Sequence, residues 1–204
     1  EVRTLDLKEL VRNLPKTELI YWKDSYVKRF GTKVFRVEPD GKKKAYVILQ
    51  GTAYHAKSGG QPSDTGTITD ASGLVLDIKR VMMVEGVAVH YGNIIQGHLD
   101  SLRPGTEVSG EINWDERFLS MKRHTAGHLL DHCLEVATGV SSKTIDSWLG
   151  EPCYVTYAGG HPNQSALDQA AELEVEGIRK GLPVRLEFVS YKKMLEIAAD
   201  APNI

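Results

Sequence analysis

The first 110 residues contain short runs of β-branched and aliphatic residues, and turn signals separate these runs. The turn signals include Pro39-Asp40-Gly41, Ser58-Gly59-Gly60 and Glu85-Gly86. Short strands at this spacing are typical of a small barrel or sandwich. The expected elements are a short helix over 5–14, which Pro15 terminates, and strands over 33–37, 45–49, 74–84, 87–94 and 107–113.

The second half of the chain has helical patterns instead. Asp115 is expected to cap a helix that runs to Thr138, with Gly139 at its C-terminal end. A further helix is expected to start at Ser165, with strands over 154–157 and 184–190 beside it. We therefore predict an α+β fold, with a glycine-rich, β-barrel-like domain over 1–105 and an α/β domain with one long helix over 106–204.

The composition is that of an ordinary globular protein, with 204 residues of which 41% are hydrophobic and 25% charged. This excludes a disordered or fibrous chain. No run of about 18 apolar residues is present, so we expect no membrane span, and no signal peptide is visible. Cys133 and Cys153 are too few for a disulfide framework, so a reducing, cytoplasmic location is expected.

The net charge of −2 hides an asymmetry, because residues 1–50 carry 12 Lys and Arg against 7 Asp and Glu. Such a polarity favours contact of this end with a polyanion. A solvated lobe, with Lys42-Lys43-Lys44 at a hairpin tip, is the alternative.

His124 and His128 lie four residues apart in the expected long helix, so both imidazoles can reach one metal ion. Imidazole is the usual protein ligand of Zn²⁺. His132 continues the stripe but lies about 12 Å from His124 along the helix axis, too far to share the ion. The pattern lacks the Glu of His-Glu-x-x-His, which would supply a general base. A polar helix face with satisfied histidines is the alternative.

A second concentration of polar groups lies in the glycine-rich stretch over 51–66. Thr52, His55, Gln61 and Asp64 surround the pair Gly59-Gly60. Paired glycines let a backbone approach a ligand closely. The alternative is a wide hairpin whose polar residues bond their own backbone.

Together the two motifs define a pattern that runs along most of the chain. Thr52, Gly59-Gly60-Gln61-Pro62 and Asp64, followed by His124-Thr125-Ala126-Gly127-His128, resemble the AlaX family, free-standing relatives of the editing domain of alanyl-tRNA synthetase. Tyr21-Trp22-Lys23-Asp24-Ser25-Tyr26 is similar to the family's opening strand, and the glycine-rich lobe resembles the medium-length members. The resemblance covers essentially the whole chain.

The resemblance implies a trans-editing hydrolase that deacylates mischarged seryl-tRNA(Ala), and glycyl-tRNA(Ala) besides, in support of translation fidelity and without ATP. It implies a zinc site in the α/β editing domain, with His124 and His128 as two of the ligands. Thr52 matches the threonine that distinguishes serine from alanine, and Gln61 matches a glutamine close to the bound substrate. The partner is then tRNA(Ala), held through the positive first 50 residues. No residue is assigned as the catalytic base.

The chain departs from the family pattern at the zinc site. The family completes this site with a Cys-Gly-Gly-Thr-His motif, which does not occur in residues 1–204. Cys153 and His161 lack the spacing to replace it, and Cys133 is rotated away from His128 on the helix. We expect the motif to follow Ile204 in the full protein, with a shortened, metal-free protein as the alternative.

Two other functions remain open at this point. One is a tRNA-binding module without catalysis, and the other is a zinc hydrolase that acts on a small ester or amide. Binding of tRNA that weakens with salt would count against the second, since a small-molecule hydrolase has no reason to release counterions.

Overall fold

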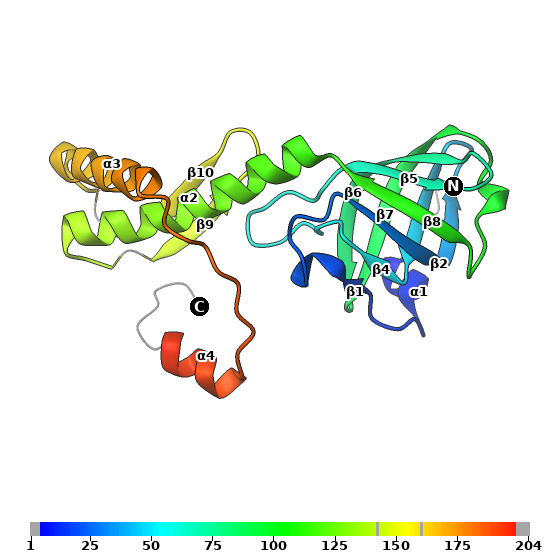
Figure 1. Ribbon diagram of the computed structural model, residues 1–204, viewed down its shortest axis with the longest axis horizontal. Helices are drawn as coiled ribbons and strands as arrows, with labels where there is room; N and C mark the ends of the chain where they lie inside the picture. Colours follow the sequence, from blue (N-terminus) through cyan, green and yellow to red (C-terminus); the bar gives the residue numbers. More distant parts are fainter. Residues whose placement is uncertain (1–4, 142, 160, 199–204) are drawn as a thin grey trace. The chain divides into compact units, whose positions relative to one another are not determined.

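Figure 1 shows the computed structural model, which describes residues 5–141, 143–159 and 161–198. Contacts divide the chain into two compact units, Glu1–Ser120 and Met121–Ile204. The division falls inside helix α2 (Trp114–Thr138), so this helix contributes its first turns to one unit and the remainder to the other.

The first unit contains a closed barrel of six antiparallel strands, which confirms the predicted α+β class and the barrel-like N-terminal domain. The strands follow one another around the barrel in the order β2-β3-β7-β6-β5-β8. Their bounds are Arg29–Asp40 (β2), Lys44–Leu49 (β3), Gly66–Asp70 (β5), Val75–Val84 (β6), Val87–Gln96 (β7) and Glu107–Ile112 (β8).

Short elements flank this barrel. Helix α1 (Leu7–Val11) precedes it, and strand β1 (Glu18–Leu19) pairs in parallel with β4 (Gly51–Thr52). Two 3-10 turns follow at Ile20–Trp22 and Leu99–Ser101.

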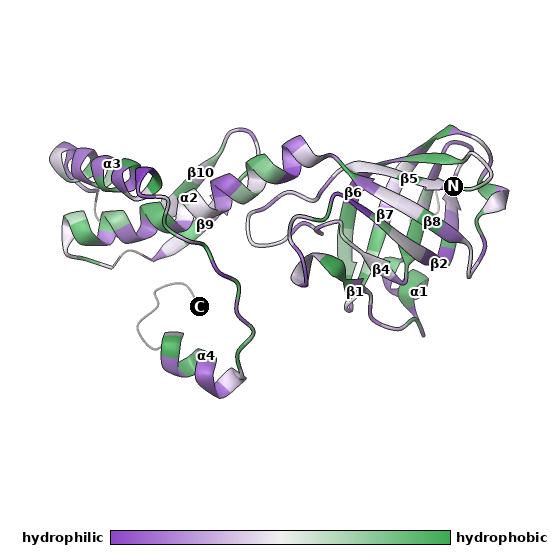
Figure 2. Cartoon of the chain, in the orientation of Figure 1, coloured by the Kyte–Doolittle hydropathy of each residue, from purple (hydrophilic) through white to green (hydrophobic). Residues whose placement is uncertain are grey.

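The barrel closes around a core because alternate residues of its strands are apolar and point inward. Strand β8 shows the alternation most simply: Val108, Gly110 and Ile112 are buried, and the residues between them are exposed. Figure 2 colours much of β6 and β7 as hydrophobic, and β6 contributes Leu76 and Ile78 to the buried core.

Strand β8 also corrects the expected domain boundary at residue 105. It pairs with β2 on one side and with β5 on the other, so the barrel cannot close without it. The Pro-Gly turn before it connects two strands of one barrel, with Gly105 at φ +90° and the Thr106 N–H donating to the Arg103 carbonyl over 2.9 Å. The boundary between the two compact units accordingly lies after Ser120.

Helix α2 begins at Trp114, one residue before the expected cap. Asp115 therefore lies in the first turn, together with Glu116, where carboxylates interact favourably with the helix dipole. The helix ends as predicted, since Gly139 adopts φ +70° and its N–H donates to the Glu135 carbonyl over 2.8 Å.

The second unit joins the rest of α2 to an antiparallel hairpin of β9 (Thr144–Trp148) and β10 (Tyr154–Tyr157), to α3 (Gln164–Arg179) and to α4 (Tyr191–Ala198). Its core is small: Cys133 and Leu134 of α2 pack with Ala170 of α3.

The start of α3 and the segment after it differ from the prediction. Asn163, rather than Ser165, caps α3 by accepting a hydrogen bond of 2.9 Å from the Ala166 N–H. Residues 184–190 alternate between apolar and polar side chains, as a strand would, but no described strand pairs with them. Val184 and Phe188 are consequently 76% and 71% exposed.

Within the residues that the structure describes, no helix is both long and apolar enough to cross a membrane.

Candidate functional site

The glycine-rich loop, defined here as His55–Asp64, connects β4 to β5 and has a regular internal structure. Ser58 and Gln61 exchange backbone hydrogen bonds of 3.2 and 2.8 Å, which close a tight turn. Gly59 and Gly60 form its tip at φ +53° and +75°, a backbone region that other residues rarely adopt. The glycine pair is therefore required by the turn itself, and residues 57–59 are the exposed part of the loop.

Asp64 closes the base of this loop. Its N–H donates to the His55 carbonyl over 3.0 Å, and its Oδ2 accepts a hydrogen bond of 2.6 Å from the His55 N–H. Gln61, the expected substrate-binding glutamine, lies between these anchored ends and is only 6% exposed.

Arg117, in the first turn of α2, holds the loop base from the other side. Its Nε donates to both carboxylate oxygens of Asp64, over 2.9 and 3.0 Å, and its Nη2 donates to the same carboxylate. Nη2 also donates to the Ala53 carbonyl over 2.6 Å. Both side chains of the ion pair are almost fully buried, with exposed fractions of 4% and 3%. Sequence analysis missed Arg117, because nothing in the local pattern distinguishes it from a solvated helix residue.

Thr52, which the resemblance assigns to distinguishing serine from alanine, lies in the protein interior. Its exposed fraction is 0%, and its Oγ1 lies 2.9 Å from Nε2 of His90, a fully buried residue of β7. The His90 Nδ1 lies 3.1 Å from the Val47 carbonyl, which only accepts, so Nδ1 carries the proton and Nε2 accepts from Thr52. Thr52 in turn accepts from the Tyr54 N–H over 3.1 Å. The Thr52 hydroxyl therefore donates its hydrogen to Nε2 of His90, in the interior of the barrel.

His124 and His128 lie on α2 in the second unit, with ring centroids 5.1 Å apart and the planes tilted by 35°. Partial burial, and secondarily the neighbouring His128, lower the pKa of His124, which keeps its imidazole neutral at neutral pH. The neutral ring is the form that ligates metals. His132 is exposed and lies one turn further along the helix than His128.

A carboxylate that sequence analysis overlooked lies beside this pair. Asp131 Oδ2 lies 3.5 Å from Nδ1 of His128, and Tyr157 of β10 donates a hydrogen bond of 2.6 Å to Asp131 Oδ1. Its spacing, three residues after His128, is the signal that would have found it.

The two imidazoles fit half of a tetrahedral zinc donor set. Across residues 5–141, 143–159 and 161–198, no three His, Cys, Asp or Glu side chains are placed to hold one ion together. Thr52 and Gln61 belong to the first unit and the histidines to the second.

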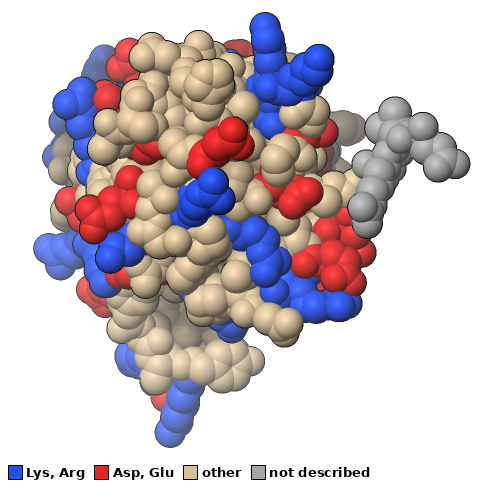
Figure 3. Space-filling model, turned by 90° about the vertical axis from the view of Figure 1, so that its right-hand side faces the viewer, with Lys and Arg blue, Asp and Glu red and all other residues tan. Residues whose placement is uncertain are grey.

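The positive charge of the first 50 residues is distributed among carboxylates. Figure 3 shows one face of the molecule, where Lys and Arg side chains lie next to Asp and Glu. Arg29 pairs with Glu111 at 2.8 Å, and Lys33 lies 3.7 Å from Glu107. The face in this view is thus mixed in charge, with no unbroken basic stripe.

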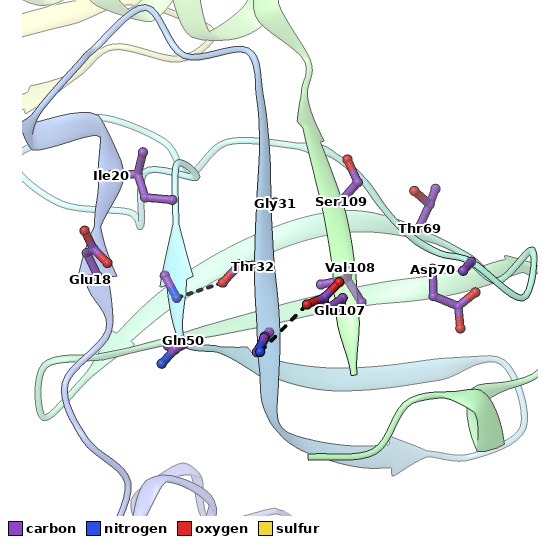
Figure 4. Close-up of a pocket in the computed structure, with 13 residues that line it drawn as sticks. Glu18, Ile20, Gly31, Thr32, Gln50, Thr69, Asp70, Glu107, Val108 and Ser109 are labelled. Carbon is purple, nitrogen blue, oxygen red and sulfur yellow. Dashed lines mark hydrogen bonds and ion pairs between the residues drawn. The ribbon is translucent and has the colours of Figure 1, made fainter. Parts of the chain in front are cut away.

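A groove of about 620 Å³ in the first unit contains none of the four expected site residues. Figure 4 shows its lining, drawn from β1, β2, β4, β5 and β8; Lys33 lies near Glu107, and the Asp70 carboxylate accepts hydrogen bonds from the Ser72 and Leu74 N–H groups. Thr32 Oγ1 accepts from the Gly51 N–H over 3.0 Å, and Glu18 pairs with Lys23 at 2.5 Å. No site is assigned to this groove.

The sequence is similar to that of known proteins over the barrel and the start of α2. Residues 4–116 match the family model of tRNA synthetases class II (A). The alanine–tRNA ligase of Pyrobaculum calidifontis is 41% identical over 122 residues, which are 59% of this chain and 12% of that protein. The corresponding enzyme of Sulfurisphaera tokodaii is 36% identical over 125 residues, 61% of this chain and 13% of the relative. That of Pyrococcus abyssi is 35% identical over 122 residues, with coverages of 60% and 12%.

The chain thus spans about an eighth of the length of these relatives. The matches agree with the motif resemblance, because the AlaX proteins are themselves related to alanyl-tRNA synthetase. Since the family model covers more than half of its residues, the chain belongs to the class II (A) tRNA synthetase family.

Proposed function

We propose that this protein acts on tRNA(Ala) as an editing deacylase. It hydrolyses the aminoacyl ester of seryl-tRNA(Ala) and, secondarily, that of glycyl-tRNA(Ala). The observation that carries the proposal is the anchored glycine-rich loop, which stands in a barrel related in sequence to part of alanine–tRNA ligases. A fixed loop whose exposed part, residues 57–59, includes a glycine suits close approach of a substrate to the backbone.

An aminoacyl ester is already activated, so its hydrolysis demands mainly positioning and stabilisation of the developing oxyanion. In this proposal the exposed part of the loop, residues 57–59, contacts the aminoacyl end of the tRNA, and the buried Gln61 supports this part of the loop from behind. His124 and His128 would hold Zn²⁺, which supplies a water of lowered pKa or a fixed point for the substrate amino group. Exposed Lys and Arg side chains of the first unit would bind the phosphates of the tRNA. Such contacts position the tRNA but do not recognise its base sequence.

Discrimination between serine and alanine depends on a single hydroxyl. A polar group that pairs with this hydroxyl remains unpaired when alanine is bound, which disfavours the correct product. The burial of Thr52 argues against direct contact with this hydroxyl. We therefore place Thr52 behind the loop, where it supports the backbone that contacts the substrate.

The test measures release of the amino acid from seryl-, glycyl- and alanyl-tRNA(Ala) by the purified protein with added Zn²⁺. We expect release from seryl-tRNA(Ala) at least about tenfold faster than from alanyl-tRNA(Ala), a difference of about 1.4 kcal/mol in activation free energy. Seryl-tRNA(Ser) serves as the control for recognition of the tRNA body.

Two other outcomes would each indicate a different function for this protein. Salt-dependent binding of tRNA(Ala) with no release of amino acid would overturn the proposal in favour of a binding module. Hydrolysis of small esters at a rate that tRNA does not affect would indicate a small-molecule hydrolase.

A further inference from the structure

Arg117 joins segments that are far apart in the sequence. Its guanidinium binds Asp64 at the end of the glycine-rich loop and the carbonyl of Ala53 before its start. Nη1 donates to the Ser25 carbonyl over 3.4 Å, and Cζ lies 5.7 Å from the ring centre of Tyr21. One side chain thereby fixes both stems of the loop to the N-terminal segment and to α2.

The burial of this ion pair gives it a geometric role. Removing two charges from water costs several kcal/mol, and the attraction recovers this only with good geometry and satisfied hydrogen bonds. Asp64 meets the condition, because its carboxylate accepts from Arg117 and from the His55 N–H. An apolar pair would give the barrel comparable stability, but it would not hold two loop stems at fixed positions.

Fixed stems matter because the loop tip has little support of its own. Gly59 and Gly60 are held by the Ser58–Gln61 turn and have open space around Gly59. The loop is also held at Lys57, whose N–H donates to the Val81 carbonyl over 3.2 Å, and Arg117 fixes the two ends of the loop on either side of this contact. A displacement of about 1 Å from a productive geometry can cost a reaction on the order of a hundredfold in rate.

We propose that Arg117 is a positioning residue, which places the glycine-rich loop for the reaction of its bound substrate. This rests on the proposed deacylase function for its effect on rate, while its effect on the loop is independent of any activity. The role requires a planar fork, since three acceptors at different places are served by one guanidinium. A lysine ammonium keeps the charge but cannot reach all three in fixed directions.

The experiment compares two substitutions that conserve charge, so that neither leaves a buried ion unpaired. Arg117→Lys removes the fork, and Asp64→Glu moves the carboxylate by one methylene. Arg29→Lys is the matched control, because Arg29 pairs with Glu111 on the barrel surface and is 74% exposed. Hydrogen exchange of the loop amides and deacylation kinetics are measured on the full chain.

We expect the amides of His55 and Asp64 to exchange at least about tenfold faster in Arg117→Lys, with strand amides of the barrel unchanged. The kcat on seryl-tRNA(Ala) should fall about tenfold or more while KM changes less than about threefold. Asp64→Glu should show the same pattern, and Arg29→Lys should match the wild type in both measurements.

The outcomes separate this inference from the proposed function. If both variants fold and their loop amides exchange hydrogen at the rate of the wild type, the positioning role is overturned, whatever the activity of the variants. Faster loop exchange with kcat and KM unchanged would show that the anchor is structural only. If the wild type has no deacylase activity, the proposed function fails, and the exchange data still decide whether Arg117 holds the loop. Should Arg117→Lys not fold, Asp64→Glu alone carries the decision.

Discussion

His90 is an ionisable side chain at a position where a charge has no compensation. Its ring is fully buried in the barrel, and its polar contacts are the Val47 carbonyl and the Thr52 hydroxyl. Burial lowers the pKa of His90 to about 4, and the hydrogen bond to Val47 raises it only in part. The neutral ring therefore has a fixed tautomer, and that tautomer directs the hydroxyl of Thr52.

The first prediction concerns acid sensitivity. In the unfolded chain His90 binds its proton near pH 6.5, but in the folded barrel only near pH 4. Between these values the unfolded state holds more protons, so the free energy of unfolding falls as the pH is lowered, by roughly 3 kcal/mol over the whole window. Above about pH 6.5 this contribution is constant. Urea denaturation across the window measures the slope, and His90→Asn should flatten it. Identical slopes would show that the ring is protonated in the folded state.

The second prediction concerns Thr52→Val. This substitution keeps the shape of the side chain but leaves His90 Nε2 and the Tyr54 N–H without their partner in a buried place. The free energy of unfolding should fall by about 1–3 kcal/mol. Thr69→Val, on the outer side of β5, is the control and should change it by less than about 0.5 kcal/mol.

The same variant distinguishes support from direct contact. If Thr52 only supports the loop, deacylation of seryl- and glycyl-tRNA(Ala) should fall by the same factor. A loss confined to the seryl substrate would restore a direct role for the hydroxyl, because glycine has none to offer.

At the scale of elements, the sequence predicts those helices and strands whose boundaries depend on nearby residues. The strands over 45–49, 87–94 and 107–113 and the helix to Thr138 are confirmed within a few residues, because hydrophobic periodicity and glycine turns set them. Strand β5 was missed, since Gly66-Thr67-Ile68-Thr69-Asp70 has one apolar residue and two residues that favour turns. Its position as a strand follows from its neighbours β6 and β8.

Gly66 marks the point where β5 enters the barrel, and it gives the third prediction. Its φ is +150°, and a Cβ there would lie 2.1 Å from the Glu111 carbonyl oxygen. Gly66→Ala should lower the free energy of unfolding by about 1–3 kcal/mol, because either β5 or β8 must move away. Gly31→Ala, on β2 with nothing within 4 Å of its Cβ, is the control. Equal midpoints of urea denaturation would contradict the close approach.

Helix α2 carries the fourth prediction, which concerns metal binding by the proposed ligand pair. His124→Ala and His128→Ala should each weaken binding of Zn²⁺ at least about tenfold, while helical circular dichroism stays unchanged. His132→Ala is the control on the same helix, since this ring is exposed and one turn away from the pair. Equal zinc affinities in competition with a chelator would remove both histidines from the ligand set.

At the scale of the whole molecule, the candidate site shows what a sequence leaves out. Gln61 is recognisable from the adjacent glycine pair, and His124 and His128 are recognisable from their spacing of four residues. Arg117 and His90 lie 53 and 38 positions from their partners Asp64 and Thr52, and only the closed barrel brings them together. Burial, rather than residue type, then decides that Thr52 faces the protein interior.

The fifth prediction tests the division of the chain. A chain that ends at Ser120 retains all six strands and Arg117, so it should unfold cooperatively with heat. A chain that ends at Gly105 lacks β8, leaves the edges of β2 and β5 unpaired, and should aggregate or remain unfolded. Cooperative melting of the shorter chain would show that the barrel does not depend on its last strand.

The late position of β8 has a consequence during synthesis on the ribosome. Arg29 and Glu111, which face each other across the β2–β8 seam, are 82 positions apart. At an elongation rate of roughly 5–20 residues per second, the nascent chain waits about 4–16 seconds before β2 can find this partner. During that time the free edge of β2 can pair with another nascent chain on the same message. We therefore expect a chaperone that shields extended segments to raise the yield of this protein, and slow codons before residue 107 to lower it.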